Sequence, residues 1–126
     1  MCAGATLDAA MHSVYGDPRL LRRMVRNLLE NAVRYGAGSP VVLRLAATQE
    51  GLLLDVCDTG PGIAEAERER IFEPFYRIAG ASEAAGGVGL GLSLVRQIAR
   101  HHGGDTLCLP NGGSGCCFRV SLPCAH

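Results

Sequence analysis

The spacing of apolar residues along this chain predicts a long helix near its beginning. From residue 18 to about residue 35 the apolar side chains recur at helical intervals and form one face. They are Leu21, Val25, Leu28, Ala32 and Tyr35. Asp17 and Pro18 mark the expected start, because aspartate caps helix N-termini and proline suits the first helical position. The charged residues between the apolar ones predict a solvated opposite face.

Shorter alternating segments predict strands. Residues 41–48 and 52–57 read as a β-hairpin that turns at Gly51, and residues 106–109 and 117–122 as a second hairpin around a glycine-rich turn at 111–115. Alternation places Leu54, Val56 and Asp58 on the same side of their strand. An aspartate that continues an apolar row is unusual for a residue that serves only solubility.

The remaining segments predict a second long helix and two loops. The helix is expected over residues 90–102, with Leu90, Leu94, Ile98 and His101 on one face, and two glycines end it. Residues 6–15 read as a weak strand, 65–71 as a short charged helix and 78–86 as a mobile loop. This order predicts an α+β two-layer sandwich, with a mixed, mostly antiparallel sheet packed against helices. At 126 residues we expect one domain, residues 1–126.

The charge composition excludes several functions. Twelve basic and twelve acidic residues balance, so nothing indicates binding to nucleic acid or to a membrane surface. All basic residues are arginine, which excludes lysine-dependent chemistry such as the Walker phosphate loop or a Schiff base. No apolar run reaches the length of a bilayer span.

The six cysteines do not form a recognisable metal or disulfide pattern. No Cys-x-x-Cys pair occurs, and no histidine lies at ligand spacing. We therefore interpret most of them as small strand residues and expect a reducing, cytoplasmic setting.

Polar residues on the first helix indicate a ligand site. Asn27, Asn31 and Arg34 lie on one stripe beside the apolar face. Amides that are even partly buried need partners, and a hydrated Mg²⁺ ion with phosphate oxygens would supply them. The alternative is that the amides only bridge the helix to a loop. Tyr35 is placed either to cover a bound base or sugar or to pack in the core.

Two glycine-rich stretches add to this picture. Asp58 precedes a turn containing Gly60 and Gly62, where a carboxylate can accept a hydrogen bond from the exocyclic amine of adenine while bare backbone approaches the ring. Residues 86–91 directly precede the second helix, so that their N–H groups can surround phosphate oxygens. Taken singly, the first could be a simple turn that ends a strand, and the second a flexible loop.

In this order, the motifs resemble the ATP-binding (Bergerat-fold) domain of bacterial sensor histidine kinases, from about residue 16 to 123. Residues 27–35 are similar to the asparagine box of that family, 58–63 to its first glycine box, 72–75 to its phenylalanine box and 87–92 to its second glycine box. Residues 115–123 resemble the closing strand of that family's domain.

The resemblance implies roles for individual residues. Asn27, Asn31 and Arg34 would be the catalytic residues, with Asn27 and Asn31 as the Mg²⁺ ligands. Asp58 would contact adenine, and residues 78–86 would form the ATP lid, which Arg77 borders. The implied ATP-binding set is Asn31, Arg34, Tyr35, Asp58, Gly60, Gly62, Ile63, Arg77, Gly87, Val88, Gly89, Leu90, Gly91 and Leu92.

The same resemblance implies a reaction and partners. The domain would bind Mg²⁺ and ATP and donate the γ-phosphoryl group to a histidine on a separate dimerising domain, upstream of a response regulator. Related ATPases carry a glutamate where this chain has Asn27, which favours a kinase. The four histidines lack the phosphoacceptor motif, so we expect the acceptor outside this chain. Arg34 replaces the usual lysine, and the lid is short.

Two other functions stay open. One is a nucleotide-sensing module that binds ATP or ADP without transferring phosphate. The other is a serine kinase of the anti-sigma-factor type, which shares this pocket.

Overall fold

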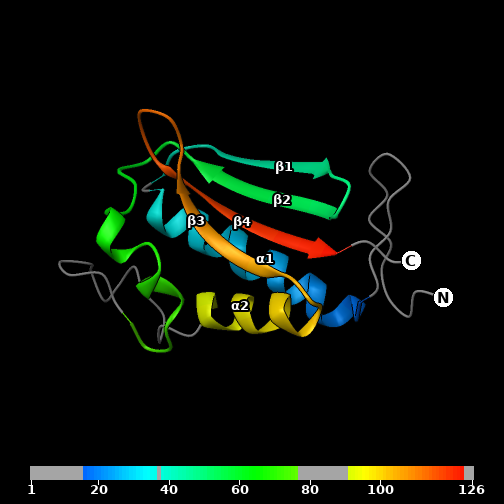
Figure 1. The fold of residues 1–126 in the computed structure, drawn as a ribbon. Helices are drawn as coiled ribbons and strands as arrows, with labels where there is room; N and C mark the ends of the chain where they lie inside the picture. The colour runs from blue at the N-terminus through cyan, green and yellow to red at the C-terminus, as the bar shows by residue number, and fades with distance from the viewer. Residues whose placement is uncertain (1–15, 37, 77–90, 124–126) are drawn as a thin grey trace.

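The computed structural model describes residues 16–36, 38–76 and 91–123. Its order is α1 (Pro18–Tyr35), β1 (Val41–Ala47), β2 (Gly51–Asp58), two 3-10 turns (Glu65–Glu67 and Arg70–Phe72), α2 (Gly91–His101), β3 (Asp105–Pro110) and β4 (Cys116–Pro123). The predicted weak strand at 6–15 and the loop at 78–86 lie outside the described residues. The elements are labelled in Figure 1.

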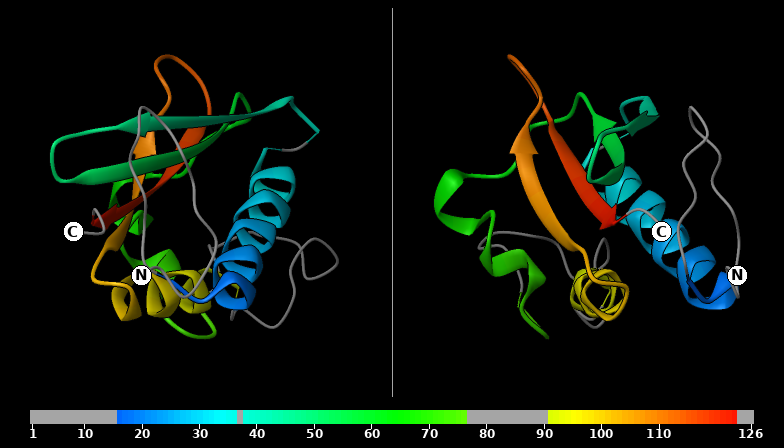
Figure 2. Two further views of the ribbon diagram at one scale, coloured as in Figure 1. Left: turned by 90° about the vertical axis from the view of Figure 1, so that its right-hand side faces the viewer. Right: turned by 45° about the vertical axis from the view of Figure 1, so that its right-hand side comes forward.

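The four strands form one antiparallel sheet in the order β1-β2-β4-β3. The two predicted hairpins are both present, and β4 pairs with β2 to join them. Both helices lie on one side of the sheet and contact each other, as the two views in Figure 2 show. This confirms the predicted two-layer α+β architecture.

Helix α1 begins and ends as its sequence predicts. The Asp17 side chain accepts a 2.8 Å hydrogen bond from the Arg19 N–H and caps the first turn. Leu21, Leu28 and Ala32 are buried, and Met24 between them is fully buried. The helix therefore presents its apolar face to the core and keeps Arg19, Arg22, Arg23 and Arg26 in solvent, while Arg34 near its end is half-buried.

Helix α2 buries only part of the predicted face: Ile98 is buried as predicted, but most of its buried side chains lie on a neighbouring stripe. Its buried side chains are Leu92, Ser93, Val95, Ile98 and Ala99. His101 is exposed, and Leu94 is only partly buried. Leu92, Val95 and Ala99 form, with Ile98, the stripe that packs into the core, whereas the predicted stripe ran through Leu90, which lies outside the described residues. The predicted helix at 65–71 is likewise replaced by the two 3-10 turns.

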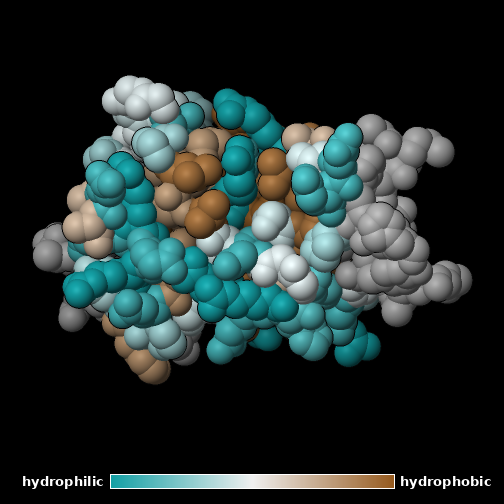
Figure 3. Space-filling view, in the orientation of Figure 1, coloured by the Kyte–Doolittle hydropathy of each residue, from teal (hydrophilic) through white to brown (hydrophobic). Residues whose placement is uncertain are grey.

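The core lies between the sheet and the helices. Leu54, Val56 and Asp58 all face it and are buried, which confirms the predicted alternation of β2. On the opposite, outer face of the sheet, register partners on neighbouring strands form rows. One such row consists of Arg44, Asp55 and Arg119. Figure 3 shows apolar residues on this face with hydrophilic ones between them.

A disulfide on the outer face corrects our interpretation of the cysteines. Cys57 on β2 and Cys117 on β4 are register partners with Cα atoms 4.0 Å apart, and their sulfurs are bonded. Sixty residues separate them in sequence, so no local spacing could reveal the pair. Cys108 and Cys116 are buried and free.

Candidate functional site

The end of α1 lies directly against the turn that follows β2. A Cβ at Gly36 would lie 2.9 Å from the Cβ of Asp58, and one at Gly60 would lie 2.5 Å from the Gly36 carbonyl oxygen. The Ser39 hydroxyl accepts a 3.1 Å hydrogen bond from the Thr59 N–H. The asparagine-bearing helix and the first glycine-rich stretch are therefore brought together, and only glycine fits at their closest approach.

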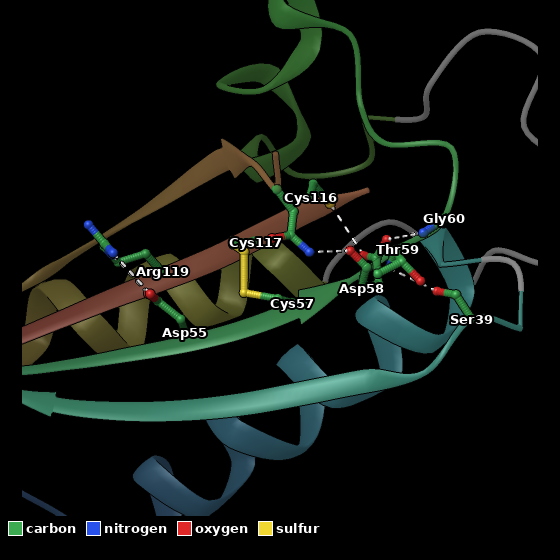
Figure 4. The surroundings of a disulfide bond; sticks show 10 residues. Ser39, Asp55, Cys57, Asp58, Thr59, Gly60, Cys116, Cys117 and Arg119 are labelled. Atoms are coloured by element: carbon green, nitrogen blue, oxygen red, sulfur yellow. Dashed lines mark hydrogen bonds and ion pairs between the residues drawn. A yellow bond between two sulfur atoms is a disulfide. The ribbon is translucent and has the colours of Figure 1, made fainter. Parts of the chain in front are cut away.

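Asp58 is a buried carboxylate at the centre of this junction. It is 1 % exposed. Its Oδ1 accepts a 2.9 Å hydrogen bond from the Gly60 N–H, and its Oδ2 accepts a 3.4 Å hydrogen bond from the Cys116 thiol. Figure 4 shows both contacts at the strand ends. Because a carboxylate offers about four acceptor positions, Asp58 retains capacity for a further donor.

The turn between β3 and β4 supports the backbone of Asp58 and its neighbours. The Asn111 side chain donates a 2.8 Å hydrogen bond to the Asp58 carbonyl oxygen. The Ser114 hydroxyl lies 2.8 Å from the carbonyl oxygens of both Thr59 and Gly60. A Cβ at Gly115, whose φ is +83°, would lie only 2.0 Å from the Asp58 carbonyl oxygen.

These supporting residues were not among the predicted site residues. Asn111, Ser114 and Cys116 lie more than fifty residues from Asp58, and a glycine-rich hairpin turn has an adequate explanation of its own. The one sequence feature that could have indicated their role is the turn at 111–115, where three of five residues are glycine, more than a hairpin turn requires.

Cys116 remains a thiol beneath Asp58. Its pKa is held far above the usual range by a hydrogen bond with the Cys108 sulfur and by burial. The thiol has a single hydrogen, and the 3.4 Å contact with Oδ2 lets it donate that hydrogen to Asp58. Two buried sulfurs and one carboxylate thus form the polar part of the core at this end of the sheet.

The second part of the candidate site lies where α1 passes the start of α2. Asn31 is 4 % exposed, and its Nδ2 donates a 2.7 Å hydrogen bond to the Asn27 carbonyl oxygen. A Cβ at Gly91 would lie 3.0 Å from that same Nδ2. The paired asparagines and the end of the second glycine-rich stretch are therefore neighbours. The Asn27 side chain is half-buried.

Arg34 and Tyr35 are both half-buried near the end of α1. The Tyr35 ring lies 6.2 Å from the ring of Phe118 on β4, and burial raises the pKa of its hydroxyl. Of our two interpretations of Tyr35, packing against the core is the one that this contact supports.

The other predicted ATP-binding residues divide into two groups. Gly62 has φ +81° and its Cβ position lies 3.1 Å from the Gly115 carbonyl oxygen, while Ile63 and Leu92 are buried in the core. Arg77, Gly87, Val88, Gly89 and Leu90 lie outside the described residues.

The segment that resembles a phenylalanine box has one buried and one exposed phenylalanine. Phe72 is buried, and the Arg96 guanidinium of α2 lies 4.3 Å from its ring centroid. Phe75 is 68 % exposed and has φ +63°, a conformation that non-glycine residues seldom adopt. Arg96 also pairs with Glu69 and bonds Thr106, so it ties the box to α2 and β3.

The sequence and structural comparisons agree with this geometry. Residues 16–126 match the family described as histidine kinase-, DNA gyrase B-, and HSP90-like ATPase. The chain belongs to this family. It is 42 % identical over 112 residues to the adaptive-response sensory kinase SasA of Crocosphaera subtropica, and 39 % identical over 119 residues to SasA of Parasynechococcus marenigrum. These alignments cover 87 % and 93 % of the chain but only 29 % and 31 % of the relatives.

Solved structures give the same result. The mycobacterial sensor histidine kinase MprB superposes with a TM-score of 0.79 at 36 % identity, over 90 % of this chain and 78 % of that one. Full-length ShkA in complex with AMPPNP superposes with a TM-score of 0.77 at 31 % identity, over 98 % of this chain and 25 % of that one. The chain is thus an ATP-binding domain of the type found in sensor histidine kinases, as its motifs predicted.

Two features are absent from the described residues. Neither helix has the length and apolar character that crossing a membrane would require. No three histidine, cysteine, aspartate or glutamate side chains in the described ranges gather where they would hold a metal ion. A cation at Asn27 and Asn31 would depend on amide oxygens and water.

Proposed function

We propose that this domain binds Mg²⁺ and ATP and donates the γ-phosphoryl group to a histidine on a separate dimerising domain, which passes it to a response regulator in the cytoplasm. The observation that carries the proposal is the buried Asp58 carboxylate, held at the meeting point of α1, β2 and β4 with acceptor capacity to spare. A neutral adenine with its exocyclic amine matches that capacity.

The residues present fit the nucleotide and the cation. Asp58 would accept from adenine, and Gly60 and Gly62 would let the backbone lie close to the base. Asn31 uses its Nδ2 within α1, so its amide oxygen is the atom suited to Mg²⁺, with Asn27 beside it. Arg34, Tyr35, Ile63, Leu92 and Gly91 would border the nucleotide, and Arg77 with residues 87–90 would complete the phosphate end.

The domain's contribution to the reaction is positioning and charge neutralisation. Bound Mg²⁺ would offset the negative charge of the phosphates. Asn27 and Asn31 would orient the phosphate end, and Arg34 would add a permanent positive charge. Position 27 is an asparagine, which cannot act as a general base for water, and this favours transfer to a protein acceptor over hydrolysis.

Asp58→Asn tests the adenine assignment. The amide would present a donor to the adenine amine, so we expect ATP affinity to fall roughly 10- to 100-fold by titration calorimetry. Asp55→Asn is the matched control, because it removes the same charge from the same strand on the opposite face. ATP affinity that is equal in Asp58→Asn and the native chain would contradict the assignment.

Transfer is tested separately from binding. The domain is mixed with a histidine-bearing dimerising domain of a sensor kinase and ATP labelled in the γ-phosphate. We expect acid-labile label on the acceptor domain that depends on Asn31. ATP binding without any labelled acceptor would favour the sensing module, and acid-stable label on a serine would favour the serine kinase.

A further inference from the structure

The Cys57–Cys117 disulfide lies against the candidate nucleotide site without entering it. Cys57 directly precedes Asp58, and Cys117 directly follows Cys116, whose thiol bonds Asp58. Alternation along each strand puts the disulfide on the outer face of the sheet and Asp58 and Cys116 on the inner face. Figure 4 shows the bond joining the two strands at the base of the site.

The bond sets the spacing of the two strand ends that build this site. Strand β2 carries Asp58, and β4 begins at the turn whose Asn111 and Gly115 contact the Asp58 backbone. All these contacts require the ends of β2 and β4 to stay close together. A covalent link at the adjacent register pair holds that spacing, whereas two thiols at the same place leave it to the hydrogen bonds alone.

We propose that Cys57 and Cys117 form a reversible redox pair that tunes the nucleotide affinity of the adjacent site. The inference rests on the proposed function, because a kinase that consumes ATP works where thiols are kept reduced. Disulfides in such a setting are mostly transient or redox-sensing rather than permanent staples. The oxidised form is the tighter-binding form, since its site is pre-organised before the nucleotide arrives.

The chemistry is thiol–disulfide exchange with a low-molecular-weight disulfide. The thiolate of one cysteine attacks a sulfur of the small disulfide and releases one small thiol, leaving a mixed disulfide. The second cysteine then attacks the protein sulfur of that mixed disulfide, releasing the second small thiol. The protein pair loses two electrons and two protons in total, and the small disulfide gains them. Cys57 is 1 % exposed and Cys117 7 %, so exchange requires local opening and equilibration is slow.

The pairing is tested by peptide mapping of the full chain. The chain has no lysine, so trypsin cleaves only after arginine. Cleavage yields residues 45–68, whose single cysteine is Cys57, and residues 101–119, which hold Cys108, Cys116 and Cys117. After equilibration with oxidised glutathione we expect these peptides to be linked. The link should vanish in Cys117→Ser and persist in Cys116→Ser. A link that persists in Cys117→Ser, or no link in the native chain, overturns the proposal.

The functional effect is tested by titrating ATP into the native chain in oxidised and reduced glutathione. We expect at least threefold tighter binding in the oxidised buffer. Cys57→Ser/Cys117→Ser should bind like the reduced chain in both buffers, and the control Cys2→Ser, which keeps the pair, should respond like the native chain. Equal affinity of the native chain in both buffers overturns the inference while leaving the proposed function intact. Absence of ATP binding in both buffers overturns the proposed function itself, and the inference with it.

Discussion

The two ends of the candidate site are built in different ways. Around Asp58, three separate parts of the chain meet through hydrogen bonds to side chain and backbone, and glycines allow contacts that a Cβ would block. Around Asn31, the described contacts are a bond within α1 and the close approach of Gly91. The end around Asp58, where we propose that adenine binds, is therefore held together by contacts from three parts of the chain, whereas the described contacts around Asn31, where we propose that the phosphates bind, are fewer.

Substitution at Gly115 is expected to have the largest effect on stability, because Gly115 packs directly on the backbone of Asp58. In Gly115→Ala the new Cβ would lie 2.0 Å from the Asp58 carbonyl oxygen at a φ of +83°. We expect the free energy of unfolding in urea to fall by about 3 kcal/mol or more.

Gly112→Ala is the matched control for that change. Gly112 has φ +63°, and nothing lies within 4 Å of its Cβ position, so the substitution carries only the backbone cost, about 1 kcal/mol. Equal losses in the two variants would show that the packing of Gly115 on Asp58 contributes nothing.

A smaller effect, on nucleotide affinity, is expected from substitution of Asn31. Asn31→Ala should lower Mg²⁺·ATP affinity roughly tenfold, because the cation loses an amide ligand and the helix loses little. Affinity for ADP in excess EDTA should change much less. Titration calorimetry with and without Mg²⁺ measures the difference, with Glu30→Ala as the exposed control on the same helix. An equal loss with and without Mg²⁺ would remove the cation role from Asn31.

The smallest effect is expected on the pH dependence of stability. It arises from Glu69 and Asp105, which pair with arginines of α2. A hydrogen bond from Arg96 lowers the pKa of Glu69. Burial acts to raise the pKa of Asp105, but hydrogen bonds from the Thr106 N–H and Arg100 outweigh it and lower it. A carboxyl with a lowered folded pKa stabilises the fold above its unfolded pKa, near pH 4, and loses that contribution as pH falls through the folded value.

Both carboxylates are largely open to solvent, so each contribution should stay below about 1 kcal/mol. Glu69→Gln should be less stable than the native chain in urea at pH 7, and the difference should shrink below pH 4. A difference that is unchanged at low pH would mean that Glu69 acts through packing rather than charge.

Local patterns predicted most of the fold. The bounds of α1 were read from a cap, a proline and an apolar period, and both hairpins from alternation around glycine turns. The face of α2 was only partly right: Ile98 is buried as predicted, but the sequence also offers a second apolar stripe through Leu92, Val95 and Ala99, and tertiary packing buries that one. The disulfide was missed because the register between β2 and β4 depends on tertiary pairing, and the two cysteines lie sixty positions apart in the sequence.

The candidate site was predicted only in part for the same reason. Asp58 and Asn31 could be named because each lies in a local pattern whose polarity is unusual. Cys116, Asn111 and Gly115 act by lying against Asp58 after the second hairpin pairs with the first. Such contacts come from sheet order, and no period in the sequence encodes sheet order.

The two ends of α1 have distant neighbours. At its start, the Asp17 N–H donates a 3.1 Å hydrogen bond to Nε2 of His102, at the far end of α2. At its finish, Gly36 lies on Asp58. Eighteen residues of helix span about 27 Å between these points. One uninterrupted helix therefore connects the contact with His102 to the contact with Asp58, so a shift of α1 along its axis would change both contacts together.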